Sequence, residues 1–551
     1  MNASEEQTFE QGTSCHTLTK KSRQAVSRRA FAKGLIIGGA ACAVGISAVG
    51  CGGSPDTLGV HNGGKSSVHD GSEPPASLTI LYNDAPNSFD PVNKWDGWYT
   101  VCRGLTETLV AFDTDMSLRP CLAVDWTNID ELTWQFTIRE GVFFQSGRQM
   151  DPQAVKESLE RSIERAPRAA KKVRIDSIDV DENTIVLHTT EPVSTLPGEL
   201  AEPVFSIVDV EVVDTAPAHA GTGPYEGDDV SSTESFTLRA YKGYWGGTAT
   251  VAALTCRRAA DANTRAIALR SHDADISSSL LASDLKTFEN DSAFTTLTSE
   301  SVRSVFVICN LRNSLLADRV IREALSKATD RETLGNLLLG GNISPNGLPF
   351  PSYLSYSRAV SDVAQTFDLS SAATLLDSAG YLDTDGDGIR EKDGQRLSFS
   401  LAYYSSRPEF LLLAPALQDA YRQIGVEITL QLYENVDTVY YNADFDLMLY
   451  NTTTVGNGDP SYFLTLYFAS DGSENAGGYA NDEIDTLIEM MRGEFNQETR
   501  FELAAQATRL IMADCPNIFI GSSVMNAVCI SDVTGYSLYP VEYYGVTNKL
   551  W

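Results

Sequence analysis

The segment that decides the fold reads LRPCLAVDWTNIDELTWQFTIREGVFFQSGRQMDPQAVKESLERSI and spans residues 118–163. Between Leu132 and Arg139, apolar and polar residues alternate, and this period of two predicts a strand with one buried face. Further along, Asp151 precedes Pro152, which is the arrangement of a helix N-cap followed by a proline in the first turn. The apolar face of that helix is expected at Ala154, Val155, Leu159 and Ile163. The segment therefore predicts a strand, a turn and a helix.

The rest of the chain repeats this mixture of strand and helix patterns. Residues 77–82 are a predicted strand, and residues 518–529 and 536–546 are predicted to return to strand and loop. Residues 397–401 and 426–432 alternate as strands do, and the amphipathic stretch 411–424 between them predicts a helix. A strand, a long helical crossover and a second strand form an α/β unit, so we predict an α/β fold.

Several motifs occur in the order that is found in one protein family. Residues 118–163 contain a Pro-x-Leu-Ala-x-x-Trp element, a Phe-Thr-Ile-Arg strand and a Gly-Val-Phe-Phe element. Matching elements follow at 221–225 (GTGPY), 241–247 (YKGYWGG), 268–276, 306–310, 320–325 and 330–331. With these motifs the chain resembles the family 5 extracellular solute-binding proteins, the peptide-, dipeptide- and nickel-binding components of ABC importers. The resemblance covers about residues 77–551.

The resemblance implies a two-lobe fold of the periplasmic-binding-protein type II (cluster C) kind, with an extra subdomain in lobe 1 and a two-strand hinge. It places lobe 1 at 77–305 with the extra subdomain at 111–219, lobe 2 at 306–522, and a return to lobe 1 at 523–551. The chain would cross between the lobes near 303–310 and 520–525. In such a fold the ligand binds in the cleft and the lobes close over it.

The first 50 residues have the pattern of an export signal. Arg28 and Arg29 lie in the sequence SRRAFAK, which resembles a twin-arginine signal. The uncharged run 34–50 is short and glycine-rich for a permanent membrane span. It ends just before Cys51, as in the lipobox of bacterial lipoproteins. We therefore expect a signal peptide at 1–50 and acylation of Cys51, with an uncleaved N-terminal membrane anchor as the alternative.

Residues 51–76 are rich in Gly, Ser, Pro and Asp, and this composition predicts a flexible tether. An acylated Cys51 would hold the protein at the outer face of the cytoplasmic membrane, on the periplasmic or cell-surface side. The resemblance implies that it works there with ABC permease and ATPase subunits. We expect the protein to be a monomer.

The composition of the 551-residue chain narrows the function further. Hydrophobic residues make up 42% and charged residues 21% of the chain, as in soluble globular proteins. The formal net charge is −31, which argues against nucleic acid as a partner. The nine cysteines lack the spacing of a zinc site. Those that follow Cys51 predict either one or two disulfides or buried free thiols.

Aromatic and small polar residues supply the candidate ligand contacts. Trp95, Trp98 and Tyr99 form an aromatic cluster on a polar stretch, which is typical either of a ligand-facing wall or of core packing. Arg407 can hold a carboxylate through two parallel hydrogen bonds, or form a surface ion pair. The candidates from lobe 2 are Thr453, Thr454, Gly456 and Asn457.

The loop NTTTVGNGDP at 451–460 bears on the class of ligand. In peptide-binding members of the resembled family, this loop carries an aspartate for the peptide α-amino group, and that position is Gly456 here. Nickel-binding members place aromatic residues in the loop and a histidine after it, whereas this chain has Thr454, Gly458 and no histidine beyond His272. Neither template fits. We predict a short peptide as the ligand, with nickel or another metal chelate as the alternative.

Two further motifs have weaker links to chemistry. Residues 383–388 (DTDGDG) resemble the start of a calcium loop, but Gly394 occupies the position that needs a bidentate glutamate, so we predict a solvated turn. Ser283 and Lys286 satisfy Ser-x-x-Lys without its companion motifs. We therefore predict a binding protein with no catalytic residues, metal site or cofactor, and a secreted hydrolase is the alternative of another class.

Overall fold

The computed structural model describes residues 75–551. The predicted signal peptide, Cys51 and residues 52–74 of the predicted tether lie outside the described residues.

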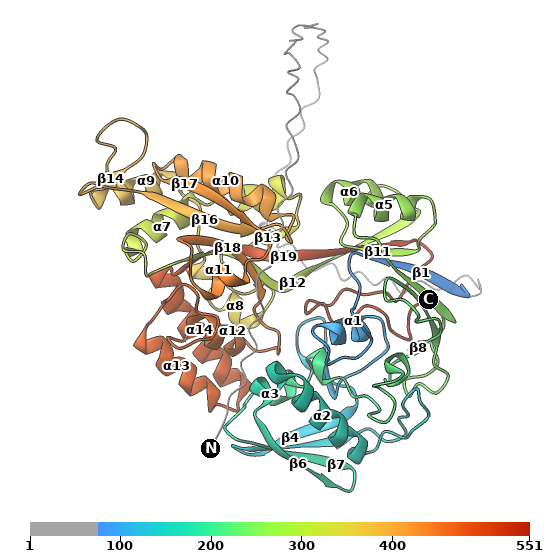
Figure 1. Cartoon of the computed structure of the whole chain (residues 1–551). Coiled ribbons are helices and arrows are strands. Elements are labelled where there is room, and N and C mark those ends of the chain that lie inside the picture. Colours follow the sequence, from blue (N-terminus) through green and yellow to red (C-terminus); the bar gives the residue numbers. More distant parts are fainter. Residues whose placement is uncertain (1–74) are drawn as a thin grey trace, which may run out of the picture. The chain divides into compact units, whose positions relative to one another are not determined.

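A mixed sheet of 11 strands organises the described chain (Figure 1). Its order is β17-β16-β18-β12-β19-β11-β1-β10-β9-β8, and β13 pairs with β19. The strands are β1 (Ser77–Tyr82), β8 (Tyr225–Gly227), β9 (Ser235–Ala240), β10 (Ala253–Arg258), β11 (Ile276–Ser278), β12 (Phe294–Cys309), β13 (Ile343–Pro345), β16 (Ser398–Tyr404), β17 (Glu427–Tyr433), β18 (Leu447–Thr453) and β19 (Asn517–Ile530). The parallel pairs β1–β10, β1–β11, β16–β17 and β16–β18 confirm the predicted α/β fold.

Two long strands, β12 and β19, join the two halves of this sheet. They lie side by side and antiparallel along most of their length. The first half of β12 faces the end of β19 that also pairs with β11, whereas residues 303–309 of β12 pair with β18. The strands β16, β17 and β18 on one side and β1, β8, β9, β10 and β11 on the other are thus linked by β12 and β19. This is the arrangement that the two-strand hinge of the resembled family requires. The segments expected to cross between lobes, 303–310 and 520–525, lie largely within β12 and β19, while the lobe boundaries stay a prediction.

A separate four-stranded sheet lies within the segment expected to form the extra subdomain. Its order is β4-β5-β7-β6, with β4 (Ala123–Asp130), β5 (Thr133–Ile138), β6 (Ile175–Asp181) and β7 (Thr184–Thr189). The predicted strand is β5, in which buried and half-buried residues alternate. The predicted helix is α2 (Pro152–Arg165), whose N-cap Asp151 accepts a hydrogen bond from the backbone N–H of Ala154 at 2.8 Å. The strand, turn and helix expected from this segment are confirmed.

The described chain also contains helices besides α2. From residue 96 to residue 289 these are α1 (Asp96–Cys102), α3 (Pro167–Val173), α4 (Leu196–Glu199), α5 (Ala262–Arg270) and α6 (Ala282–Glu289). From residue 319 to residue 514 they are α7 (Arg319–Ala328), α8 (Ser355–Arg358), α9 (Leu369–Ser378), α10 (Phe410–Arg422), α11 (Asp437–Tyr441), α12 (Ser461–Phe468), α13 (Asp482–Arg492) and α14 (Gln497–Asp514). The short pairs β2 (Val110–Phe112) with β3 (Leu118–Pro120), and β14 (Glu391–Lys392) with β15 (Gln395–Arg396), complete the strands.

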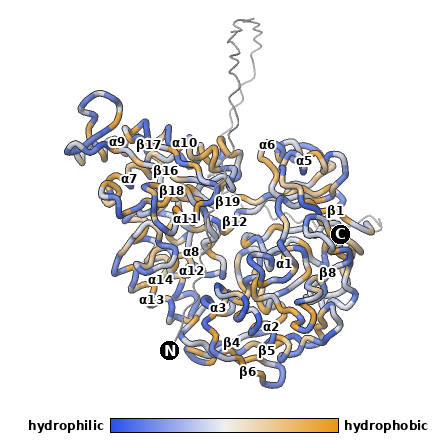
Figure 2. Tube along the Cα trace, in the orientation of Figure 1, coloured by the Kyte–Doolittle hydropathy of each residue, from blue (hydrophilic) through white to orange (hydrophobic). Residues whose placement is uncertain are grey.

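Apolar residues are distributed among many short elements. Figure 2 shows hydrophobic and hydrophilic residues interspersed along the described chain, and no described helix is both long and apolar enough to cross a membrane.

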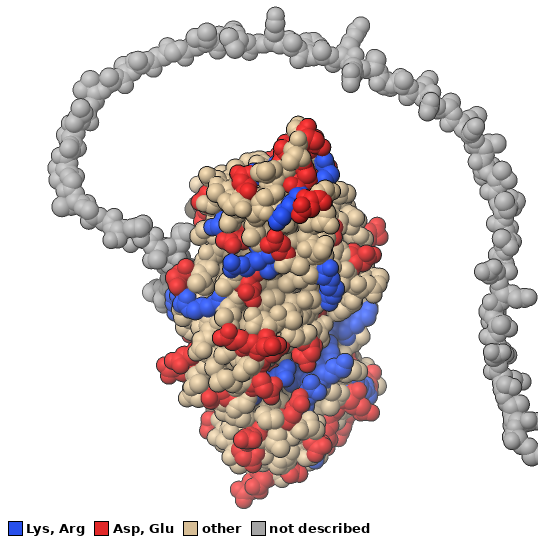
Figure 3. Space-filling model, turned by 90° about the vertical axis from the view of Figure 1, so that its left-hand side faces the viewer, with Lys and Arg blue, Asp and Glu red and all other residues tan. Residues whose placement is uncertain are grey.

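On the face shown in Figure 3, acidic side chains are spread over the surface and basic side chains form smaller groups among them.

The cysteines of the described chain are free thiols. Cys102 is half-buried, and Cys121, Cys256, Cys309, Cys515 and Cys529 are buried. Of the two alternatives left open by the sequence, the structure has the buried thiols. Burial raises the pKa of the Cys515 thiol to about 11 and that of Cys529 to about 12, so these sulfurs stay protonated and unreactive near neutral pH.

Candidate ligand-binding site

A cavity of about 1780 Å³ lies between residues of the two predicted lobes. Its walls come from α1, residues 260–286, β12, β18 and the C-terminal segment 536–544. Eleven of its lining residues are Trp or Tyr, and seven acidic residues are matched by seven basic ones. Broad aromatic faces with balanced charges suit an organic ligand that carries both apolar and charged groups.

The three aromatic residues singled out in the sequence all line this cavity. Trp98 donates a hydrogen bond from Nε1 to the backbone carbonyl of Glu542 at 2.6 Å. Tyr99 is 8% exposed, and its ring centroid lies 4.6 Å from that of Trp98. Trp95 is 65% exposed, and the guanidinium of Arg168 lies 4.2 Å from its ring centroid. One aromatic residue is thus freely presented to solvent and two are held in place.

Asp96 fixes the position of this aromatic cluster. Its buried carboxylate accepts hydrogen bonds from the backbone N–H groups of Asn87 and Ser88, at 2.9 and 2.7 Å, and from Asn93 Nδ2 at 2.9 Å. These donors belong to residues 87–93, the turn that precedes α1. A carboxylate in the first turn of α1 also interacts favourably with the helix dipole. The turn and the helix are therefore tied together at the cavity wall.

Three of the other predicted contacts also line the cavity, namely Arg407, Thr453 and Gly456. A Cβ atom at Gly456 would meet only Thr453, at 3.5 Å, and Tyr462, at 3.9 Å. The cavity therefore has room at the position where the resembled peptide binders carry an aspartate. Direct contact between a ligand and any of these residues stays a prediction.

The remaining two predicted contacts lie outside the cavity lining. Thr454 is fully buried and donates from Oγ1 to the carbonyl of Val302 at 3.0 Å. Asn457 is buried and donates from Nδ2 to Glu199 Oε1 at 2.7 Å. Both side chains therefore bond to the protein and support the wall from behind.

Sequence reasoning missed the C-terminal wall and one arginine. Tyr539, Glu542, Tyr543 and Tyr544 all line the cavity, and a cluster of tyrosines on a polar stretch is the same signal that singled out residues 95–99. Arg303 lines the cavity from β12. A lone arginine at the start of an apolar run gave no such signal, because its position depends on how the strands pair.

Charged side chains pair with one another within the cavity wall and behind it. Burial raises the pKa of Glu199 to about 7, against the opposing influence of Lys172. Lys172 donates to Glu202 at 2.6 Å. For Glu202 the effect of burial is outweighed by Lys172 and Arg168, and its pKa is lowered. Asp459 and Arg500 form a further buried ion pair at 2.9 Å. Asp459 therefore has a structural partner within the protein.

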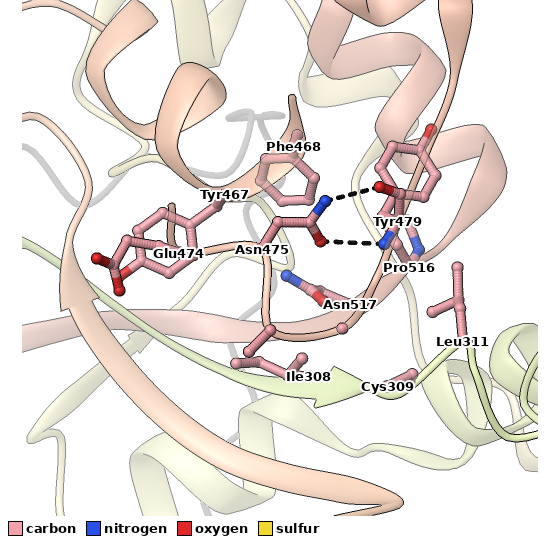
Figure 4. Close-up of a pocket in the computed structure, with 12 residues that line it drawn as sticks. Ile308, Cys309, Leu311, Tyr467, Phe468, Glu474, Asn475, Tyr479, Pro516 and Asn517 are labelled. Carbon is pink, nitrogen blue, oxygen red and sulfur yellow. Dashed lines mark hydrogen bonds between the residues drawn. The ribbon is translucent and has the colours of Figure 1, made fainter. Parts of the chain in front are cut away.

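A second cavity, shown in Figure 4, is too small for a ligand. Its volume is about 10 Å³, which is room for about one water molecule. Asn475 closes the loop beside it, since its side-chain amide donates to the carbonyl of Tyr479 at 2.7 Å and accepts from the N–H of Tyr479 at 3.0 Å. We therefore assign this cavity to local packing.

The aspartate-rich loop at residues 383–388 and the Ser-x-x-Lys pair, Ser283 and Lys286, show no arrangement that requires a catalytic role within the described chain. In the loop, Asp383 accepts from the backbone N–H groups of Gly386 and Gly388, and Asp387 is paired with Arg396. Asp383, Asp385 and Glu391 have carboxylate oxygens within 4.8 Å of one another, on an exposed turn. Ser283 and Lys286 line the large cavity but form no hydrogen bond with each other in the described chain.

Two of the motifs that carry the family resemblance meet at Glu107. Its carboxylate accepts hydrogen bonds from Thr222 at 2.9 Å, Tyr244 at 2.8 Å and Trp245 at 2.9 Å. Thr222 comes from the GTGPY motif, and Tyr244 and Trp245 come from the YKGYWGG motif. These motif residues thus bond within the segment predicted as lobe 1 and are not part of the cavity lining.

Comparison with known proteins places the chain in a family. Residues 117–475 match the bacterial extracellular solute-binding proteins, family 5. The nickel-binding protein NikA of Staphylococcus aureus is 24% identical over 443 residues, covering 80% of this chain and 88% of that protein.

Solved structures show the same fold. A nickel ABC transporter protein from Bacillus halodurans superposes with a TM-score of 0.75 and 28% identity, over 86% of this chain and 99% of that one. The oligopeptide-binding protein AppA of Bacillus subtilis, solved with a nonapeptide, has a TM-score of 0.70 and 20% identity over 87% of this chain and 99% of that one. These similarities confirm the predicted two-lobe type II fold of periplasmic binding proteins.

The matched family consists of extracellular solute-binding proteins, and the relative from Escherichia coli is named a nickel-binding periplasmic protein. With its large sheet, its two linking strands and a cavity lined from both sides, this chain belongs to the family 5 solute-binding proteins of ABC transporters.

Proposed function

We propose that the chain captures a short peptide in the large cavity, closes its lobes over it and delivers it to an ABC permease. The observation that supports this proposal is the cavity itself. Its volume of about 1780 Å³ exceeds the roughly 300–1,000 Å³ of common small-molecule pockets. A peptide fills such a space, and its termini and backbone find partners among the charged and tyrosine side chains of the wall.

A nickel chelate is the second candidate. It is favoured by the similarity to nickel-binding relatives. The lining contains no histidine among the described residues, and a bare ion would occupy a small fraction of the volume. The metal would therefore enter with an organic chelator that supplies the nitrogen ligands.

Thermal-shift measurements on the purified full chain separate the two candidates. Pools of di- to pentapeptides, Ni²⁺ alone and Ni²⁺ with L-histidine serve as ligands. A ligand that binds only the folded state raises the melting temperature by mass action, and we expect the peptide pools to do so. If only the nickel–histidine mixture raises the melting temperature, the nickel chelate becomes the proposed ligand in place of the peptide. If no ligand raises it, both candidate functions are contradicted.

Closure would occur about β12 and β19, with lobe 1 at 77–305 and 523–551 and lobe 2 at 306–522. A ligand shifts an open–closed equilibrium only by its preference for one state. The wall supplies such a preference, because Trp98 and Tyr99 approach the cavity from lobe 1 while Arg407, Thr453 and Gly456 approach it from lobe 2. We propose that the protein acts as a monomer.

We further propose that the chain is exported by its twin-arginine signal and anchored through acylated Cys51. Replacing Arg28 and Arg29 together by lysine should leave an unprocessed precursor inside the cell. Cys51→Ala should release the exported protein from the membrane fraction, whereas the control Cys42→Ala, within the leader, should not. Retention of Cys51→Ala at the membrane would instead support an uncleaved N-terminal anchor.

A further inference from the structure

We infer that Gly198, Glu199 and Asn457 form a clasp that holds the lobes closed and thereby strengthens ligand binding without touching the ligand. The clasp joins the segment predicted as the extra subdomain (111–219) to the segment predicted as lobe 2 (306–522). The inference rests on the proposed function, because it requires lobes that open and close around a ligand.

The backbones of the two segments are in contact at the clasp. A Cβ atom on Gly198 would lie 2.0 Å from the carbonyl oxygen of Asn457 and 3.0 Å from its carbonyl carbon. Gly198 lies in α4 and its φ is not positive, so its backbone conformation does not require glycine. The close approach of Asn457 does require it. The lack of a side chain at position 198 therefore serves a contact between the two segments.

A buried hydrogen bond accompanies this close approach. Asn457 donates from Nδ2 to Glu199 Oε1 at 2.7 Å, and the side chains of Asn457 and Glu199 are 5% and 7% exposed. A second donor, Thr195 Oγ1, lies 3.5 Å from the same carboxylate oxygen. The shorter hydrogen bond of this buried carboxylate is thus the one made between the two segments.

Two further contacts surround the clasp and extend to α13 and the residues after it. Ser194 donates from Oγ to the backbone carbonyl of Met491 at 3.3 Å, and both atoms are buried. The ring centroids of Trp134 and Phe495 lie 6.0 Å apart. The two segments therefore meet over an interface, of which the hydrogen bond between Asn457 and Glu199 is one part.

This interface should separate when the lobes open. The proposed opening is a rotation about β12 and β19, the strands that link the predicted lobes. In Figure 1, α13 lies apart from β12 and β19, so a rotation about these strands moves α13 further than it moves the strands themselves. Hydrogen bonds between α13 or its surroundings and the other segment are lost in such a movement. The clasp therefore belongs to the closed form.

The clasp acts on the ligand from outside the cavity. Gly198, Glu199 and Asn457 are not part of the cavity lining, whereas Gly456, which precedes Asn457, is part of it. For a ligand that binds only the closed form, the apparent dissociation constant is the intrinsic constant divided by the closed fraction. A contact made only in the closed form raises this fraction. The three residues are thus positioning residues that increase affinity through the closed state.

Gly198→Ala separates a clasp from a permanent contact. The added methyl group collides with Asn457 in the closed form, whereas alanine is at least as compatible with a helix as glycine is. We expect the ligand-free variant to keep the melting temperature of the wild type and to have a larger radius of gyration in small-angle X-ray scattering. Calorimetry on the purified full chain, with the di- to pentapeptide pools and the nickel–histidine mixture as probes, should show binding at least about tenfold weaker.

An exchange of donor and acceptor tests the hydrogen bond itself. Asn457→Asp removes the donor but keeps the Oδ1 atom that accepts from the backbone N–H of Asp459 at 3.0 Å, so the loop keeps its internal bond. We expect this variant to bind the same probes about five- to tenfold more weakly. Combining it with Glu199→Gln places a donor opposite an acceptor again, and the double variant should recover most of the lost affinity.

Asn475→Ala is the matched control. The side-chain amide of Asn475 donates to the carbonyl of Tyr479 at 2.7 Å, the same distance as in the clasp, but both residues lie in the segment predicted as lobe 2. The control should lower the melting temperature and leave the affinity and the radius of gyration unchanged.

The outcomes distinguish the clasp from the proposed function. If Gly198→Ala lowers the melting temperature but leaves the affinity and the radius of gyration unchanged, the contact is a permanent part of the fold. The clasp is then wrong, while the solute-binding function stands. A double variant that binds no better than Asn457→Asp also contradicts the clasp. If no probe binds the wild type, the proposed function is contradicted and scattering decides, since an equal radius in Gly198→Ala overturns the clasp and a larger one supports it.

Discussion

Asn457 donates a hydrogen bond to Glu199 at 2.7 Å across 258 residues of sequence. The backbone also approaches closely at this contact, because a Cβ atom on Gly198 would lie 2.0 Å from the carbonyl oxygen of Asn457. Glu199 ends α4 and Asn457 follows β18. The contact therefore joins the segment predicted as the extra subdomain to the segment predicted as lobe 2.

The carboxyl group of Glu199 should make stability depend on pH. Burial raises its pKa from 4.5 to about 7, so between these pH values the folded state binds more protons than the unfolded state. Stability from this group is therefore greatest below pH 4.5 and is lost as the pH rises to about 7. The loss is up to about 3 kcal/mol at 1.36 kcal/mol per pKa unit.

Glu199→Gln keeps an acceptor for Asn457 and removes the titration. We expect the variant to gain stability relative to the wild type as the pH rises from 4.5 to 7, and the difference to stay constant above pH 8. Denaturant unfolding across this range measures the difference. Parallel stability curves for the two proteins would show that Glu199 does not titrate there.

The buried pair of Asp459 and Arg500 should be essential for stability. Their side chains are 4% and 6% exposed, and removing one partner of a buried pair leaves an uncompensated charge, at a cost of about 3–5 kcal/mol. Asp459→Asn should therefore lower the melting temperature clearly. As a control, Asp362→Asn breaks an exposed pair with Arg509 and should have little effect; equal effects of both changes would refute the assignment.

Glu107 should stabilise lobe 1 through its three donors. In Glu107→Ala, the groups of Thr222, Tyr244 and Trp245 lose their acceptor, and we expect a loss of about 2–4 kcal/mol. Glu107→Gln keeps one acceptor oxygen and should cost less. Thermal unfolding orders the two variants, and calorimetry should show unchanged ligand affinity in Glu107→Gln. If Glu107→Ala is as stable as the wild type, the predicted stabilising role of Glu107 is wrong.

Trp98 should report ligand binding by fluorescence. Its indole lines the cavity and is held by Glu542, so a ligand or a lobe movement changes the polarity around it. We expect the tryptophan emission of the wild type to shift on binding and most of this change to disappear in Trp98→Phe. Trp126→Phe, in β4 outside the lining, should retain it. An unaltered signal in Trp98→Phe would place the responding tryptophan elsewhere.

Local patterns in the sequence predicted local structure well. The alternation from Leu132 to Arg139 and the Asp151-Pro152 pair are sufficient for β5 and the start of α2, because strand periodicity and helix capping depend on neighbouring residues. The family resemblance predicted the two-lobe fold, and six of the eight candidate contacts chosen from the sequence line the cavity. It could not show that Thr453 lines the cavity whereas its neighbour Thr454 is buried.

The contacts that depend on strand register were beyond sequence reasoning. Arg303 lies opposite Thr453 only because β12 pairs with β18 in one particular register, and its direction depends on a bulge. Asn457 meets Glu199 only because two distant loops are brought together. Trp245, one of the residues that carry the resemblance, donates to Glu107 and lies outside the cavity lining, so membership of a motif did not indicate a place in the cavity wall.

The pairing of β11 with β19 has a consequence for biosynthesis. Ile276 of β11 lies beside Cys529, a residue that leaves the ribosome only after the whole of lobe 2 has been made. The pairing of β11 with β19 therefore cannot form during most of translation, and this edge of the sheet stays unpaired until the last strand has been made. A chain built in this order depends on late, long-range contacts, which form slowly, so chaperones that shield nascent chains should matter more to its yield than the intrinsic stability of either lobe.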